Sequence, residues 1–124
     1  MKNLVKTTMV LNNALDALKL KRMNTTSITD KAMSSLSVET IARGELKAIS
    51  FFDIVDDETG EVNNQVVFTT ADANFSTCSK VAQGLALDIY DLVYGGDVKL
   101  EDVEIHFSFA NSRAGNKFLS CELA

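Results

Sequence analysis

The sequence contains no proline and no tryptophan, and it has only one histidine and two cysteines among its 124 residues. It therefore offers no histidine pair at metal-ligand spacing and no Cys-x-x-Cys, and it also lacks a glycine-rich phosphate loop. No apolar run approaches the ~20 residues that a membrane-spanning helix needs. These absences disfavour an enzyme, a metal or cofactor site and a membrane protein.

Signals for processing and for disulfides are equally scarce. Asn12 and Asn13 interrupt the apolar stretch near the N-terminus, and no small-residue cleavage site follows it, so a signal peptide is not expected. Two cysteines can form one disulfide, but nothing in the sequence requires it. We expect a protein of the reducing cytoplasm.

The composition is that of a folded domain. Hydrophobic residues make up 46% of the chain and charged residues 23%, which is too apolar for a disordered chain. A length of 124 residues suits one hydrophobic core. We expect a single domain over residues 1–124.

Charge is distributed unevenly along the chain, whose formal net charge is −5. Residues 1–50 carry eight basic and four acidic side chains, whereas residues 51–124 carry four basic and thirteen acidic ones. Such asymmetry indicates an anionic partner for the basic half, although a mixed, solvated surface explains it too. The overall excess of acid argues against histone-like binding through bulk positive charge.

The clearest predicted element is a helix over residues 73–94. Its apolar residues recur at helical spacing, which places them on one stripe facing a core. They are Phe75, Cys78, Val81, Ala82, Leu85, Ile89, Leu92 and Val93. Asp72 or Asn74 is expected to cap the start of the helix, and Gly95-Gly96 to end it.

Period-two alternation predicts a hairpin on each side of this helix. Before it, a long strand Val38–Val55 turns at residues 56–60 into a return strand Glu61–Thr70. After it, Val98–Phe109 and Lys117–Leu123 form a closing hairpin. The pairs expected in that hairpin are Phe107 with Leu119, Ile105 with Cys121, and Val103 with Leu123.

The N-terminal third is less regular. We expect a first strand at Ala17–Met23, although the same region also fits a helical stripe. Residues 1–14 form an arm whose structure stays open between an extra strand, a helix and a self-association segment. Residues 24–37 are rich in Ser and Thr and are predicted to be a mobile loop. The resulting order predicts a mainly β protein, a five-stranded OB-fold-like Greek-key barrel with one helix between strands 3 and 4.

The candidate functional surface is the outward face of the long strand. Basic side chains interleaved with aromatic rings suit single-stranded nucleic acid, because cations contact phosphates and rings stack on bases. Cations on the first strand and at the tip of the last hairpin are expected to frame the same groove. The candidate nucleic-acid-binding residues are Lys19, Lys21, Arg22, Arg43, Lys47, Phe51, Phe52, Arg113, Lys117 and Phe118. The alternative is that Phe51 packs under the long loop and the charges are merely solvated.

The remaining reactive side chains have simpler interpretations. Cys78 and Cys121 fall on inward positions and are expected in the core. His106 is expected on the surface, beside Ser120 and without a carboxylate partner. The acidic residues between positions 53 and 61 lack the spacing of a calcium loop and are interpreted as a hairpin turn.

Several short segments occur in a fixed order: Thr40-Ile41, Val66–Asp72, Ser79–Ala82, Asp88–Val93 and Gly115–Ser120. Through this collinear series the chain resembles, from about residue 38 to its end, the small single-stranded-DNA-binding proteins of short-tailed phages that replicate linear DNA by protein priming. The match covers roughly two thirds of the chain, and the first 37 residues contribute only Ala17–Asn24.

The resemblance implies an OB-like fold and a protein that coats the strand displaced during replication. Such proteins shield that strand from nucleases and prevent unproductive binding of primer or polymerase. Family members stack bases on aromatic residues, often tyrosines, on the second strand and near the helix start. This sequence has Ser50, Asp57 and Phe75 in those regions, with Phe51 and Phe52 beside the first, so phenylalanines would do the stacking.

We therefore expect sequence-independent binding of single-stranded DNA by a phage-encoded protein in a bacterial host cytoplasm. Replication proteins are further candidate partners, no cofactor or metal is expected, and the protein is expected to be a monomer or weakly self-associating. The alternative is a protein-interaction module on the same fold, which captures a host protein through the edge of the long hairpin.

Overall fold

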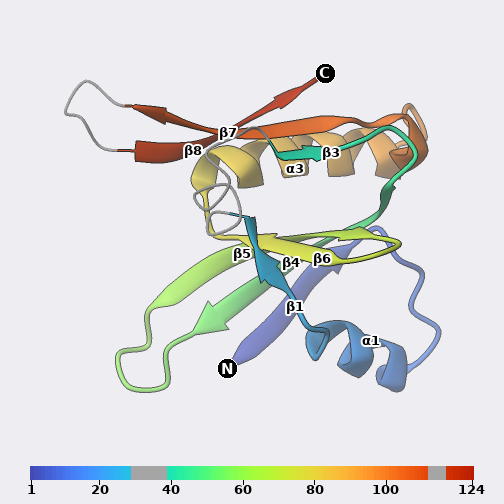
Figure 1. The fold of residues 1–124 in the computed structure, drawn as a ribbon. Coiled ribbons are helices and arrows are strands. Elements are labelled where there is room, and N and C mark those ends of the chain that lie inside the picture. The colour runs from blue at the N-terminus through green and yellow to red at the C-terminus, as the bar shows by residue number, and fades with distance from the viewer. Residues whose placement is uncertain (29–38, 112–116) are drawn as a thin grey trace.

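A computed structural model of the chain describes residues 1–28, 39–111 and 117–124 (Figure 1). A five-stranded sheet has the order β1-β4-β5-β6-β2, and a three-stranded sheet has the order β3-β7-β8. The strands are β1 (Lys2–Thr7), β2 (Thr26–Ser27), β3 (Glu39–Ile41), β4 (Leu46–Val55), β5 (Val62–Thr70), β6 (Asn74–Thr77), β7 (Ile105–Asn111) and β8 (Lys117–Leu123). The helices are α1 (Ala14–Lys21), α3 (Lys80–Tyr94) and a short 3-10 turn at Leu100–Asp102.

The mainly β class is confirmed, but the number and closure of the strands differ from the prediction. The described residues form eight strands rather than five, and their two sheets do not close into a barrel. In the same residues, no helix has the length and apolar character that crossing a membrane requires.

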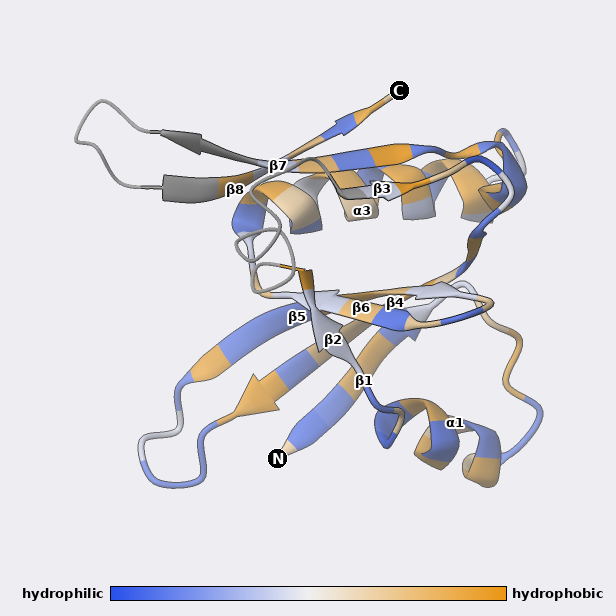
Figure 2. Ribbon diagram, in the orientation of Figure 1, coloured by the Kyte–Doolittle hydropathy of each residue, from blue (hydrophilic) through white to orange (hydrophobic). Residues whose placement is uncertain are grey.

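Helix α3 lies between the two sheets, and α1 lies on the opposite face of the larger sheet (Figure 1). The main core joins Ala82, Ala86 and Ile89 of α3 to buried side chains of both sheets, such as Phe68 and Phe107. The Phe68 and Phe107 rings meet edge to face with their centroids 5.5 Å apart. The turn between β4 and β5 is hydrophilic and points away from this core (Figure 2).

A second, smaller core lies under α1. It joins Leu20 of the helix to Phe52 and Val67 of the sheet, and all three side chains are buried. The larger sheet is therefore covered on both faces, and β4 and β5 contribute side chains to both cores.

The predicted long strand Val38–Val55 is wrong as a single element. Its two ends belong to different sheets, because β3 pairs with β7 whereas β4 pairs with β1 and β5. A turn separates them, in which the N–H of Glu45 donates to the carbonyl of Ala42 at 3.0 Å. Gly44 has a φ of +89°, a left-handed conformation that a residue without a Cβ adopts at little cost.

A bulge near the start of β4 changes which side chains share a face. Leu46 pairs with Thr70 and Ala48 with Thr69, so Lys47 is an extra residue in the ladder. Leu46 therefore lies in the main core together with Ile49 and Phe51. Strict alternation along the predicted strand would put Leu46 and Phe51 on opposite faces, because it leaves no room for an inserted residue.

The first predicted strand, Ala17–Met23, is instead helix α1. The side chain of Asn13 accepts a hydrogen bond from the N–H of Asp16 at 3.0 Å, which caps the helix. Leu, Ala and Lys are all good helix formers, so the alternative helical stripe was the correct interpretation.

Of the three structures left open for residues 1–14, the extra strand is the one found: β1 pairs antiparallel with β4 at the sheet edge. Most of the predicted mobile loop 24–37 lies outside the described residues.

The helix predicted over residues 73–94 begins later than expected. Residues 74–77 form β6, which pairs with β5, and α3 starts at Lys80. The cap is Ser79, whose hydroxyl accepts from the N–H of Ala82 at 3.3 Å, and not Asp72 or Asn74. The C-terminal boundary at Gly95 is confirmed, and Gly96 has a φ of +80°.

The closing hairpin is present, but its first strand begins at Ile105 rather than Val98, because Leu100–Asp102 form a 3-10 turn, and its register is displaced by two residues. Phe107 pairs with Cys121, Ile105 with Leu123 and Phe109 with Leu119. An even displacement does not change which face a residue occupies, and the inward-facing Ile105, Phe107 and Leu119 are buried in the main core.

Candidate nucleic-acid interface

The two cations predicted on the long strand are exposed, as expected. Arg43 is 72% exposed, and its guanidinium lies 3.0 Å from a carboxylate oxygen of Asp102. The Lys47 ammonium donates to the carbonyl of Gly44 at 3.2 Å. Surface ion pairs contribute little free energy, so a phosphate can replace the Asp102 carboxylate at small cost.

The two phenylalanines predicted to stack on bases are buried, so this part of the prediction is wrong. Phe51 is 7% exposed and packs edge-on against Tyr90, with 5.7 Å between the ring centroids. Phe52 is 1% exposed and lies in the core under α1. Both faces of a ten-residue central strand are covered here, which the alternation pattern did not reveal.

The remaining predicted residues are dispersed. Lys19, Lys21 and Arg22 belong to the last turn of α1 and its C-cap, on the far side of the larger sheet from α3. Arg113 lies outside the described residues. Lys117 and Phe118 are at the start of β8, opposite Asn111 and Ala110, and the structure describes their backbone alone. The described candidates therefore do not form one continuous face.

An aromatic cluster on α3, not predicted as the site, is the most exposed one in the described residues. Tyr90 and Tyr94 are stacked with ring centroids 6.0 Å apart and planes 13° apart. Tyr94 is 84% exposed, while Tyr90 is half-buried against Phe51. We call Phe51, Tyr90, Tyr94 and Lys6 the tyrosine cluster. Its signal in the sequence was the spacing of four between two tyrosines, which places them on one helix face.

Lys6 brings positive charge to the tyrosine cluster. Its ammonium lies 4.6 Å from the centre of the Tyr90 ring and 5.4 Å from that of Phe51. Both distances are within the range of a cation–π interaction. Lys6 reaches this side of the sheet because β1 has a register shift between Leu4 and Lys6.

Carboxylates also flank the exposed ring. Asp91 and Asp97 lie three residues before and after Tyr94, and both are exposed. They oppose an approaching phosphate, so any nucleic acid bound here depends on base stacking as much as on charge.

Neither cysteine has the lowered pKa that is typical of a reactive thiol. Partial burial raises the pKa of the Cys78 thiol, and burial together with the neighbouring Glu122 raises the pKa of Cys121. Both are therefore thiols rather than thiolates at neutral pH. The prediction that Cys78 lies in the core is wrong, because its side chain is exposed just before α3.

His106 has the carboxylate partner that the sequence did not predict. Its Nε2 lies 2.9 Å from Glu104 Oε2, and its partner across the hairpin is Glu122 rather than Ser120. The pKa of Glu104 is held below its ordinary value by His106 and by the N–H of Arg43. Within the described residues, no group of His, Cys, Asp and Glu side chains is placed to hold a metal ion.

Comparisons with protein-family models, with curated proteins and with solved structures found no match to this chain.

Proposed function

We propose that the protein binds single-stranded DNA without regard to sequence, and that it coats and protects DNA displaced during phage replication in a bacterial cytoplasm. The observation that carries the proposal is the tyrosine cluster. Tyr94 offers an exposed ring already stacked on Tyr90, and the Lys6 cation is close by. Rings and cations together are what single strands require, because every base has a face that stacks and every nucleotide carries a phosphate.

The topology supports an OB-like Greek key that is left open. If β3 and β4 are counted as one bent strand, this strand pairs with β5 in one sheet and with β7 in the other. The order β4-β5-β6, helix, β7-β8 is then that of an OB fold. A pairing between β6 and β8 would close the barrel, but β6 pairs with β2. The resemblance to phage single-strand binders points in the same direction.

The test is fluorescence anisotropy of a labelled oligo-dT of about 30 nucleotides, at low and moderate salt, with duplex DNA as competitor. Saturable binding that duplex does not displace is expected. Because stacking on one ring contributes about 1–3 kcal/mol, Tyr94→Ala is expected to weaken binding by about 5- to 150-fold. Tyr94→Phe keeps the ring and is expected to keep the affinity.

Val81→Ala is the matched control, because Val81 is exposed on the first turn of the same helix and lies outside the tyrosine cluster. No binding at low salt would overturn the proposed function. Equal losses from Tyr94→Ala and Val81→Ala would leave single-strand binding in place but remove the tyrosine cluster as its site.

Lys6→Gln tests the electrostatic half of the proposal. If Lys6 contacts one phosphate, the slope of log affinity against log salt is expected to become shallower by about 0.7. An unchanged slope would mean that Lys6 contacts no phosphate and interacts only with the Tyr90 and Phe51 rings.

The alternative function, capture of a host protein at the edge of the long hairpin, would use an edge that already has a partner strand. The outer edge of β4 is already paired with β1 through residues 50–54. A strand added by a partner there would have to displace β1 first.

A further inference from the structure

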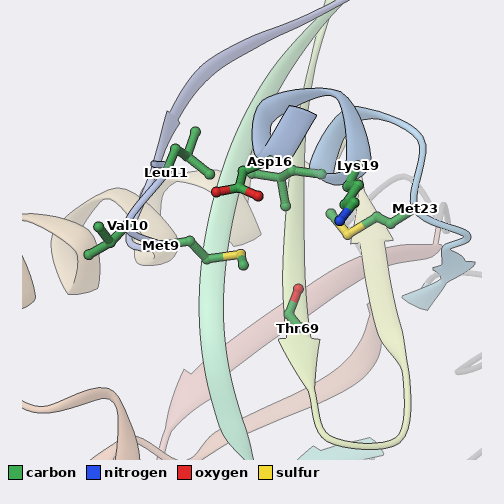
Figure 3. Close-up of a pocket in the computed structure, with 8 residues that line it drawn as sticks. Met9, Val10, Leu11, Asp16, Lys19, Met23 and Thr69 are labelled. Atoms are coloured by element: carbon green, nitrogen blue, oxygen red, sulfur yellow. The ribbon is translucent and has the colours of Figure 1, made fainter. Parts of the chain in front are cut away.

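A pocket of about 400 Å³ opens beside α1 (Figure 3). This helix lies on the opposite face of the larger sheet from α3 (Figure 1). It lies between the segment after β1, helix α1 and strand β5. Met9, Leu11, Leu20 and Met23 give it a mainly apolar wall. A volume of this size and an apolar lining with few polar groups are typical of small-molecule pockets.

Within the part of the chain that the structure describes, one polar atom of this pocket has no hydrogen-bond partner. The hydroxyl oxygen of Thr69 is buried, and no hydrogen bond to it is found among the described residues. Figure 3 shows it directed toward the space between Met9 and Met23. A buried polar group without a hydrogen-bond partner is destabilising. A bound molecule that supplies a partner for the Thr69 hydroxyl would remove this cost.

Positive charge lies at the same pocket. Lys19 lines it, and Arg22 follows on the same end of α1 with an exposed side chain. Among the described residues that line the pocket, the acidic one is Asp16, and its carboxylate accepts the N–H of Asn12 at 3.0 Å. An occupant with a flat or apolar body, one polar edge and an external negative charge would complement all of these groups.

We propose that this pocket receives one base of the bound strand, with the adjoining phosphate at Lys19 and Arg22. The inference rests on the proposed single-strand binding, but it concerns a second site on the opposite face of the sheet. The base lies between the thioethers of Met9 and Met23, since sulfur makes favourable contacts with aromatic rings and unbranched methionines shift readily to admit one. When the methionines move aside, the buried Thr69 hydroxyl becomes accessible, and a polar group on the edge of the base bonds it.

The experiment follows oxidation of methionines by dilute hydrogen peroxide, read by peptide mass spectrometry, on the full chain with and without saturating oligo-dT. Met9 and Met23 are expected to oxidise at least about fivefold more slowly when DNA is bound. Met1, which is 65% exposed at the other end of β1, is the internal control and is expected to oxidise at an unchanged rate. An abasic oligonucleotide of equal length, also at saturation, is expected to give no protection at Met9 and Met23.

Anisotropy on the same samples separates the two proposals. If oligo-dT binds but Met9 and Met23 oxidise at the free rate, or if the abasic strand protects them equally, the base pocket is overturned and single-strand binding stands. If nothing binds, both are overturned. Thr69→Val, which keeps the side-chain shape, is expected to weaken binding by about 2- to 12-fold through the lost hydrogen bond, and an unchanged affinity would contradict the role of Thr69.

Discussion

Aromatic side chains in this protein serve two purposes that the sequence alone does not separate. Phe51 and Phe52 stand next to each other on β4, yet they face opposite sides of the sheet and fill different cores. Tyr94, by contrast, leaves most of its ring in solvent. Adjacent apolar residues are typical of a strand that is covered on both faces, but the sequence alone does not show which rings remain exposed.

Removal of a buried ring is expected to lower the stability of the fold, whereas removal of the exposed Tyr94 ring is expected to leave stability nearly unchanged. Phe52→Ala removes a side chain that is 1% exposed, and it is expected to lower the free energy of unfolding by about 3–5 kcal/mol. Tyr94→Ala is expected to change it by less than about 0.5 kcal/mol, because the ring is mostly exposed. Urea unfolding followed by circular dichroism measures both. A large loss of stability in Tyr94→Ala would mean that its ring is structural.

Asp56 gives a pH-dependent contribution at the turn between β4 and β5. The N–H groups of Thr59 and Glu58 donate to its carboxylate and hold its pKa below the ordinary 3.8. A carboxyl with a lowered pKa in the folded state stabilises it above the unfolded pKa, and this contribution is lost as pH falls through the folded value. Asp56→Asn keeps the acceptor oxygen but does not titrate.

Thermal unfolding of both proteins across the acidic range checks this expectation. The wild type is expected to be more stable than Asp56→Asn at neutral pH, with a difference that disappears below the folded pKa of Asp56. A difference that is independent of pH would show that the charge of Asp56 is not what stabilises the turn.

At the scale of the element, periodicity in the sequence predicted most of the long regular helices and strands. It did not predict the places where a bulge, a turn or a short strand interrupts the pattern. Helix α3 and the closing hairpin were predicted because each repeats its pattern over many residues. The bulge at Lys47, the turn at Gly44 and the four-residue strand β6 each break a pattern within a few residues. In such short segments tertiary pairing decides the structure, so local sequence carries little signal.

The start of α3 is fixed by one side chain that the sequence pattern did not select. Ser79→Ala removes the hydroxyl that accepts the N–H of Ala82, and it is expected to lower the free energy of unfolding by about 1 kcal/mol. Ser79→Asp keeps an acceptor at this position and is expected to retain most of that stability. Chemical denaturation of the two variants provides the comparison, and equal losses would argue against capping by Ser79.

At the scale of the whole molecule, the N-terminal strand belongs to the fold. β1 pairs with β4, and the carbonyl of Met1 accepts the N–H of Val55 at 2.7 Å. Lys2 lies 4.3 Å from the centre of the Phe52 ring, and Leu4 packs against the core under α1. β1 therefore protects the edge of β4 and covers part of each core, which the sequence left undecided for residues 1–14.

Deletion of residues 2–7 is expected to expose the β4 edge and apolar surface near Phe51 and Phe52. We expect a lower urea midpoint and concentration-dependent association, because unpaired strand edges recruit other strands. Size-exclusion chromatography at two concentrations, with Lys6→Gln as the control that keeps the strand, tests this. A monomeric deletion protein of wild-type stability would show that β1 is dispensable to the fold.

The passage of the chain from β3 to β4 has a consequence for the order of folding. The strands β4, β5 and β6 are joined by short turns and can pair as soon as they are made. β3 must wait for β7, more than sixty residues further along, before it gains a partner in its own sheet. In a pulse-labelling experiment during refolding, amides of the local β4–β5 and β7–β8 ladders are therefore expected to be protected before those of β3, and the pairing of β3 with β7 is expected to form last.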